Sequence, residues 1–143
     1  CRRQRQMCIR DSYQADCILL ILSILSDDQA IEFINYANEL KLDCIIEVHD
    51  EDELKRAIKL DYPVIGINNR NLKSLEINLN NSINLNKNLT NDYILIAESG
   101  IKTSDDIKKF NSTGIYNFLI GESLLKSKDK EKKIGELLLN ESY

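Results

Sequence analysis

The sequence predicts an α/β fold in which parallel strands alternate with helices. Five short aliphatic runs carry apolar residues at successive positions, as is typical of strands buried on both faces of a parallel sheet. Segments with apolar residues at helical spacing lie between these runs. Such alternation favours right-handed crossovers between parallel neighbours. The five runs are Cys17–Leu22, Cys44–Val48, Val64–Asn68, Tyr93–Glu98 and Asn117–Gly121.

The first helix is expected from about Asp27 to Leu40. Ser26 can cap its first turn, and Gln29 stands three residues later, as in a capping box. The expected inward stripe of this helix is Ile31, Ile34, Ala37 and Leu40. Further helices are expected from near Asp50, over Asn78–Leu89, from near Thr103 and over Lys130–Leu139.

The length of 143 residues fits one domain, whereas a complete (β/α)8 barrel needs at least about 200 residues. An open doubly wound sheet and a stretch of barrel both fit the alternation, and periodicity does not choose between them. Residues 1–13 form a basic, aperiodic head that does not match the rest. We expect this head to be disordered or artefactual, as translated non-coding or adapter sequence would be, and residues 14–143 to form the domain.

The charge balance argues against some partners. The net charge is −4 and the isoelectric point about 5.1, so no dominant basic face is expected for nucleic acid or an anionic membrane. The apolar runs fall short of the ~20 residues that a membrane span needs. Among the four cysteines no metal-ligand spacing occurs, and Cys17 and Cys44 are expected as buried free thiols of a reducing, cytoplasmic compartment.

Polar residues stand where several of the apolar runs end. Glu47, Asn68, Arg70 and Glu98 follow the apolar part of three successive runs. A single glutamate there usually begins a solvated loop. Recurrence on three strands is more telling, because the carboxyl ends of parallel strands meet at one edge of a sheet. Two carboxylates, an amide and a guanidinium at one edge suit proton transfer combined with anion binding.

The last two expected strands are followed by Ser99-Gly100 and by Gly121-Glu122. Barrels often bind phosphate at this place through backbone N–H groups, and glycine permits close approach of the backbone. A dinucleotide site is not indicated, since no G-x-G-x-x-G follows a strand. The single histidine, His49, adjoins a helix start and is expected to be a solvated residue near the cap.

These motifs resemble those of the indole-3-glycerol-phosphate synthase family, in the order and at the spacing of that family. The matching runs are Ile46-Glu47-Val48-His49-Asp50, Gly66-Ile67-Asn68-Asn69-Arg70-Asn71-Leu72, Ala97-Glu98-Ser99-Gly100-Ile101 and Ile120-Gly121-Glu122-Ser123-Leu124, with Ala15–Leu20 similar to the fourth strand. The resemblance implies a partial (β/α)8 TIM barrel, from the fourth to the eighth strand.

The resemblance also implies an activity. The family is a group of carbon–carbon lyases of tryptophan biosynthesis, which close the indole ring of 1-(2-carboxyphenylamino)-1-deoxyribulose 5-phosphate with loss of CO2 and water. It needs no cofactor, and no metal site is expected. The implied catalytic residues are Glu47 as a general base, with Asn68 and Glu98. The implied substrate-binding residues are Leu19, Arg70, Leu72 and Ser99, and the implied phosphate-binding residues are Gly100, Gly121 and Glu122, the last where some relatives have serine.

The sequence departs from the family in lacking counterparts of its first three strands, which supply a lysine proposed as general acid. The 143 residues alone are therefore expected to be inactive. Phosphoribosylanthranilate isomerase, another phosphate-binding barrel, and a non-enzymatic module that binds phosphorylated ligands are the alternatives. The expected partner is a small phosphorylated substrate, with possible fusion to or association with other enzymes of the tryptophan pathway.

Overall fold

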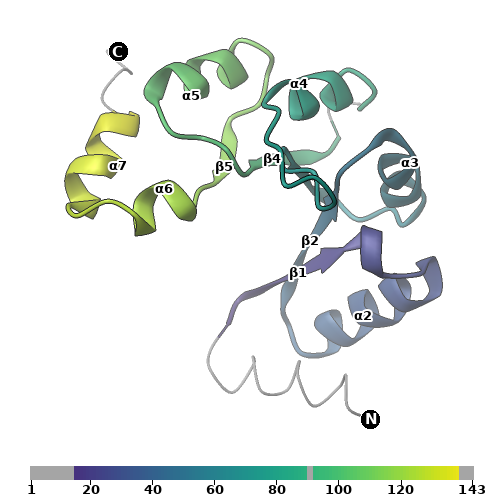
Figure 1. The fold of residues 1–143 in the computed structure, drawn as a ribbon. Helices are drawn as coiled ribbons and strands as arrows, with labels where there is room; N and C mark the ends of the chain where they lie inside the picture. Colours follow the sequence, from purple (N-terminus) through teal and green to yellow (C-terminus); the bar gives the residue numbers. More distant parts are fainter. Residues whose placement is uncertain (1–14, 90–91, 139–143) are drawn as a thin grey trace. The chain divides into compact units, whose positions relative to one another are not determined.

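The computed structural model describes residues 15–89 and 92–138 (Figure 1). Five parallel strands alternate with helices and follow one another in the sheet in sequence order, as part of a (β/α)8 barrel does. The strands are β1 (Cys17–Ile21), β2 (Asp43–Val48), β3 (Val64–Asn68), β4 (Ile94–Glu98) and β5 (Asn117–Leu119). The helices are η1 (Leu22–Ile24, a 3-10 turn), α2 (Asp27–Glu39), α3 (Glu51–Lys59), α4 (Asn80–Asn86), α5 (Ser104–Asn111), α6 (Glu122–Leu125) and α7 (Lys130–Leu138).

The predicted α/β alternation is confirmed, with shifts at the ends of elements. The run to Leu22 ends one residue earlier as a strand, and the helix expected over Asn78–Leu89 is limited to Asn80–Asn86. Two short elements, η1 and α6, were not predicted because three or four residues carry too little periodicity. None of the described helices is long and apolar enough to cross a membrane. The expectation for residues 1–13 lies outside the described residues.

Local side-chain caps define where several helices begin. The Ser26 side chain accepts a hydrogen bond from the N–H of Gln29, whose side chain accepts one from the N–H of Ser26, so the predicted capping box of α2 is confirmed. Thr103 and Asp106 form the same reciprocal pair at the start of α5. These caps satisfy N–H groups that have no partner within the helix.

The chain divides into two compact units, Cys1–Ile65 and Gly66–Tyr143. In the first, β1 and β2 pair in parallel, and α2 and α3 pack on the strands (Figure 1). The alternate residues Cys44, Ile46 and Val48 of β2 are fully buried, which identifies the face that the helices cover.

Two apolar residues of this unit do not lie as predicted. Cys17 is exposed, because it opens β1 and the side chains of a strand alternate, so that Ile18 rather than Cys17 is buried. Ile31 of α2 is 47% exposed, and the buried positions of this helix are Ala30 and Ala37. Two alanines seven residues apart form a narrow stripe that lets the helix backbone approach the sheet closely.

Arg56 of α3 connects η1 to the start of α2 through hydrogen bonds and an ion pair. The Arg56 guanidinium donates to the backbone carbonyls of Leu22 and Leu25 and lies 2.7 Å from a carboxylate oxygen of Asp27. Leu22 begins the 3-10 turn η1 and its carbonyl also accepts the N–H of Leu25, whereas Leu25 follows the turn as its C-cap residue. Arg56 therefore fixes the path from β1 into α2.

In the second unit, β4 and β5 pair in parallel, and α5 covers one of their faces. Phe110 of α5 packs against Phe118 of β5 with ring centroids 5.8 Å apart, and Ala97 beside them is fully buried. The opposite face carries Ile94 and Leu119, which are exposed. One face of the strand pair is thus packed and the other is available to the site.

A buried amide, Asn69, joins the end of β3 to the end of β4 and to α4. Its side-chain N–H groups donate to the carbonyl oxygens of Glu98 (3.0 Å) and Ser99 (3.3 Å). Its side-chain oxygen accepts from both the N–H and the hydroxyl of Ser82, at 3.1 and 2.8 Å. Every polar atom of this side chain is used, so Asn69 holds the loop after β4 in place.

We predict that Asn69→Ala lowers the free energy of unfolding by about 2–3 kcal/mol, because it removes the buried side-chain hydrogen bonds to Ser82, Glu98 and Ser99. Urea denaturation followed by circular dichroism measures the change. The exposed Asn88→Ala is the control, with an expected change below about 0.5 kcal/mol. Equal changes in the two variants would contradict the assigned role.

The thiol of Cys44 is predicted to resist alkylation in the folded protein. Burial raises its pKa to about 11, so only on the order of one thiol in a thousand is ionised at pH 8. Iodoacetamide at pH 8, followed by peptide mapping, should modify the exposed Cys17 and leave Cys44 unmodified until urea is added. Labelling of both residues at the same rate without urea would show that the Cys44 side chain is accessible to solvent and would contradict the prediction.

Candidate functional site

The polar residues at the strand ends lie on the faces that the helices leave uncovered. Glu47 of β2 alternates with the helix-covered Ile46 and Val48, and it is aligned with Ile21 of β1. By the same alternation, Leu19 shares the face of Glu47. Both residues lie in the first unit, and Glu47 is only 3% exposed although its side chain carries a carboxylate.

Asn68 and Glu98 occupy the equivalent positions of the second unit. Asn68 ends β3 after the buried Ile67, and Glu98 ends β4 after the buried Ala97. The Asn68 carbonyl accepts from the Asn81 side chain at 3.0 Å, and its side-chain oxygen accepts the N–H of Arg70 at 2.9 Å. Asn68 thereby sets the turn that directs the chain from β3 to Arg70.

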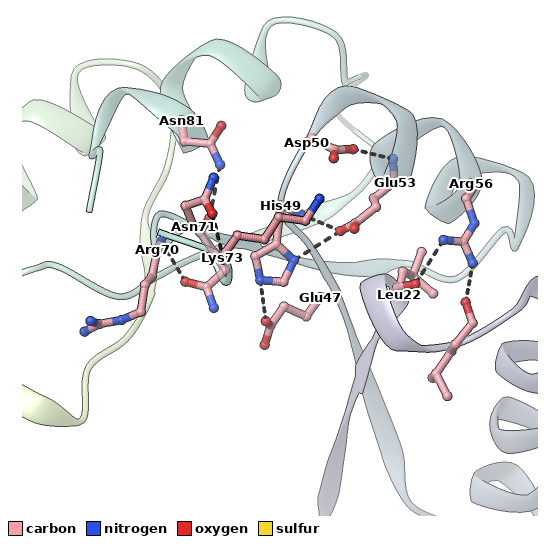
Figure 2. A network of polar contacts seen from close by, with 12 residues as sticks. Leu22, Glu47, His49, Asp50, Glu53, Arg56, Arg70, Asn71, Lys73 and Asn81 are labelled. Carbon is pink, nitrogen blue, oxygen red and sulfur yellow. Dashed lines mark hydrogen bonds and ion pairs between the residues drawn. The ribbon is translucent and has the colours of Figure 1, made fainter. Parts of the chain in front are cut away.

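His49 lies between two glutamates, as Figure 2 shows. Its Nε2 is 3.0 Å from Oε1 of Glu47, and its Nδ1 is 3.1 Å from Oε2 of Glu53. The same Glu53 oxygen accepts the backbone N–H of His49 at 2.8 Å. Only 11% of the His49 side chain is exposed, so the prediction of a solvated histidine was wrong.

The local sequence explains this arrangement. Asp50 caps α3 by accepting the N–H of Glu53, which stands at the third helical position. In a capping box the side chain at that position returns to the N–H of the cap residue. Glu53 reaches one residue further, to His49, and so fixes both the backbone and the ring.

The carboxylates on both sides raise the pKa of His49. The contact with Glu47 has the largest effect, burial opposes it, and Glu53 adds to it. A neutral imidazole has one N–H, so it can satisfy one carboxylate only. The two contacts therefore favour the doubly protonated, positively charged ring.

Arg70 lies in an ion-pair chain on the second unit. Its guanidinium is 2.7 Å from Oε2 of Glu122, and Nζ of Lys126 is 2.6 Å from Oε1 of the same carboxylate. Lys126 and then Arg70 lower the pKa of Glu122. The Glu122 carboxylate thus already pairs with Nη2 of the Arg70 guanidinium.

The backbone at Ser99 and Gly100 is in the left-handed region, with φ of 65° and 84°. Such an angle is unfavourable for serine and is a form of strain typical of functional sites. At Gly100 glycine is also required for space, because a Cβ there would collide with Cγ2 of Ile77. This turn brings the backbone of the β4–α5 loop to the edge of a pocket.

The pocket has a volume of about 480 Å³ and lies within the second unit. It brings together five of the ten predicted site residues: Arg70, Ser99, Gly100, Gly121 and Glu122. Lys102, Lys126 and Lys133 also line it, so four basic groups face one carboxylate. This balance attracts a multiply charged anion.

The remaining predicted residues do not line this pocket. Asn68 and Glu98 are at their strand ends, and Leu72 is 46% exposed in the loop after β3. Leu19 and Glu47 belong to the first unit. No group of three or more potential metal ligands occurs in the described part of the chain.

Sequence reasoning missed several residues that build these sites. Asn69 stands within a quoted motif and Glu53 three residues after Asp50, but the partners of both are fixed only by the fold. Ser123 donates its hydroxyl to the carbonyl of Ile101 at 3.0 Å, which holds α6 beside the loop after β4. For the ion pair between Glu122 and Lys126, the sequence offered one signal, the spacing of four residues that brings two side chains together on a helix.

Solved structures of low sequence identity share the fold of this chain. A mandelate oxidase mutant with a monooxide FMN adduct matches with a TM-score of 0.70 at 10% identity, covering 95% of this chain and 50% of that one. A native KDPGal structure matches with a TM-score of 0.65 at 13% identity, covering 94% and 60%. At these identities the likeness concerns the fold alone.

Curated relatives are much more similar in sequence. An indole-3-glycerol phosphate synthase of Legionella pneumophila (strain Paris) is 45% identical over 138 residues, covering 91% of this chain and 54% of the relative. The enzymes of that name from Delftia acidovorans and Acinetobacter baumannii (strain AYE) are 41% and 50% identical, covering 86% and 78% of this chain and 46% and 42% of the relatives. The chain therefore spans about half the length of the curated relatives it matches.

The family comparison covers nearly the whole chain. Residues 3–137 match the family described as indole-3-glycerol phosphate synthase. The match begins within the N-terminal head and includes every strand, every described helix except the last residue of α7, and all ten predicted site residues. The chain belongs to the indole-3-glycerol phosphate synthase family.

Proposed function

We propose that this chain supplies the later half of the active site of an indole-3-glycerol-phosphate synthase. The reaction is the ring closure of 1-(2-carboxyphenylamino)-1-deoxyribulose 5-phosphate, with loss of CO2 and water. The basic pocket that joins Arg70, Ser99, Gly100 and Gly121 is the observation that carries the proposal. Its volume and charge suit the phosphorylated end of such a substrate.

The phosphate is proposed to lie against the backbone N–H groups of the Ser99-Gly100 turn and of the Gly121 turn. These amides precede α5 and α6, and glycine at both places leaves room for phosphate oxygens. In this proposal Arg70 binds an anionic group of the substrate once the competing Glu122 carboxylate moves away. A direct phosphate contact by Glu122, expected from the motif, is disfavoured because the carboxylate is itself negative.

Glu47 is proposed as the general base of the dehydration, with Asn68 and Glu98 orienting the reacting part of the substrate. Asn68 and Glu98 end β3 and β4, and Glu47 is the last residue but one of β2. Functional groups of parallel α/β folds gather at these carboxyl ends of the strands. Leu19, and Leu72 in its exposed loop, would contact the aromatic ring. The proposed reaction uses neither a metal nor a cofactor.

The 143 residues by themselves are proposed to be inactive. Ring closure needs an acid to activate the carbonyl oxygen, and no lysine ends a strand in residues 15–89 and 92–138. The parent protein is proposed to act in the cytoplasm, fused to or associated with other enzymes of the tryptophan pathway. Phosphate binding without turnover is the second candidate function, since the pocket of the second unit is built from that unit alone.

The enzymatic proposal predicts that the chain gains activity when it is joined to the N-terminal half of the Legionella pneumophila relative. Formation of indole-3-glycerol phosphate, followed by fluorescence, should be absent with the chain alone and present with the fusion. Glu47→Gln should reduce kcat of the fusion by about 10²–10⁴-fold, because the base is lost. The exposed Glu51→Gln carries the same charge change and should retain activity; a well-folded but inactive fusion would leave only phosphate binding.

Binding of inorganic phosphate to the chain is predicted to perturb the amide NMR signals of Gly100 and Gly121. Arg70→Ala should weaken this binding at least about fivefold, because a charged donor is removed. Glu122→Gln should strengthen it about two- to fivefold, because one exposed competing charge is removed. Lys87→Ala lies outside the pocket and is the control; equal affinities in all variants would place the phosphate elsewhere.

A further inference from the structure

The buried cluster of Glu47, His49 and Glu53 adds two charged residues, His49 and Glu53, to the proposed general base Glu47. Glu53 is the least exposed acid in the first turn of α3, with 14% of its side chain accessible against 62% for Glu51. A capping role alone would leave it directed to the N–H of Asp50. Its contacts with both the N–H and the ring of His49 indicate that the position of the imidazole is specified.

We propose that His49 is a positively charged positioning residue for Glu47, held in place by Glu53, and that it keeps the Glu47 carboxylate ionised and in a fixed orientation. The role rests on the proposed function, in which Glu47 accepts a proton from the substrate. His49 acts through Glu47 and is not itself assigned a contact with the substrate.

The need for such a charge follows from burial. A carboxylate that is almost fully removed from water is destabilised relative to its protonated form, and a protonated acid cannot act as a base. An imidazolium at 3.0 Å compensates for the lost solvation. A neutral ring there would leave two carboxylates flanking an uncharged group, with a total charge of −2 instead of −1.

The charged groups of the first unit that act on His49 are Glu47 at the end of β2 and Glu53 of α3. Both raise its pKa, so protonation of the ring is favoured by folding. The protonated His49 ring therefore stabilises the folded state. Its contribution is complete below the unfolded pKa of about 6.5 and is lost as the pH rises through the higher folded pKa. The charge therefore extends towards neutral pH, where the base has to work.

NMR of the chain tests the charge directly, because His49 is its only histidine. The titration midpoint should lie above the unperturbed value of about 6.5, so that both ring nitrogens are protonated in most molecules at pH 6.5. Glu53→Gln should lower the midpoint by at least about half a pH unit, whereas Glu51→Gln should leave it unchanged. A ring protonated on one nitrogen only near pH 6.5, or the same midpoint in both variants, would overturn the proposal.

The pH dependence of kcat/KM in the fusion enzyme tests the positioning role. His49→Asn should move the acid limb to higher pH and lower kcat with little change in KM, and Glu53→Gln should move it less. Glu51→Gln should match the parent enzyme. If His49→Asn lost activity uniformly and its acid limb did not move, His49 would be a structural residue only. An inactive parent fusion would instead contradict the proposed function. In that case the NMR result would still decide the charge of the ring.

Discussion

Helices cover one face of each strand pair, and this constraint determines where every polar strand-end residue lies. The side chains of a strand alternate, so a residue next to a helix-covered position must face the other way. Ile46 and Val48 fix Glu47 in this manner, and Ala97 fixes Glu98. The chemistry of the candidate site therefore follows from hydrophobic packing on the opposite side of the sheet.

The strands and the helix starts could be predicted because their signals are local. Ser26 with Gln29, and Thr103 at the start of α5, form contacts within three or four residues, which a linear pattern contains. The buried face of α2 was predicted wrongly at Ile31 because size was favoured over fit: the sheet accepts the small Ala30 and Ala37.

The candidate residues could be named from their motifs, but their partners could not. Glu122 was grouped with phosphate-binding positions, yet it pairs with Arg70, which is 52 residues away in the sequence. His49 was expected in solvent because it adjoins the start of a helix. Its burial depends on the direction of the Glu53 side chain, which no periodicity specifies.

The pocket of the second unit and the His49 cluster of the first unit differ in the distribution of their charges. The pocket of the second unit is open and rich in cations, so an arriving anion gains from long-range attraction. The cluster around His49 is largely buried, and its charges are matched internally. The first arrangement suits capture of a ligand, and the second suits a group that must keep one protonation state.

The capping contacts at Ser26, Asp50 and Thr103 have a consequence for biosynthesis. Each is complete once three further residues have been added to the chain, so the first turn of a helix can form while later strands are still being translated. Contacts between near neighbours in sequence also close with little loss of chain entropy, which favours rapid folding. The successive strand and helix pairs are thus suited to vectorial assembly from the ribosome, in the order in which they emerge.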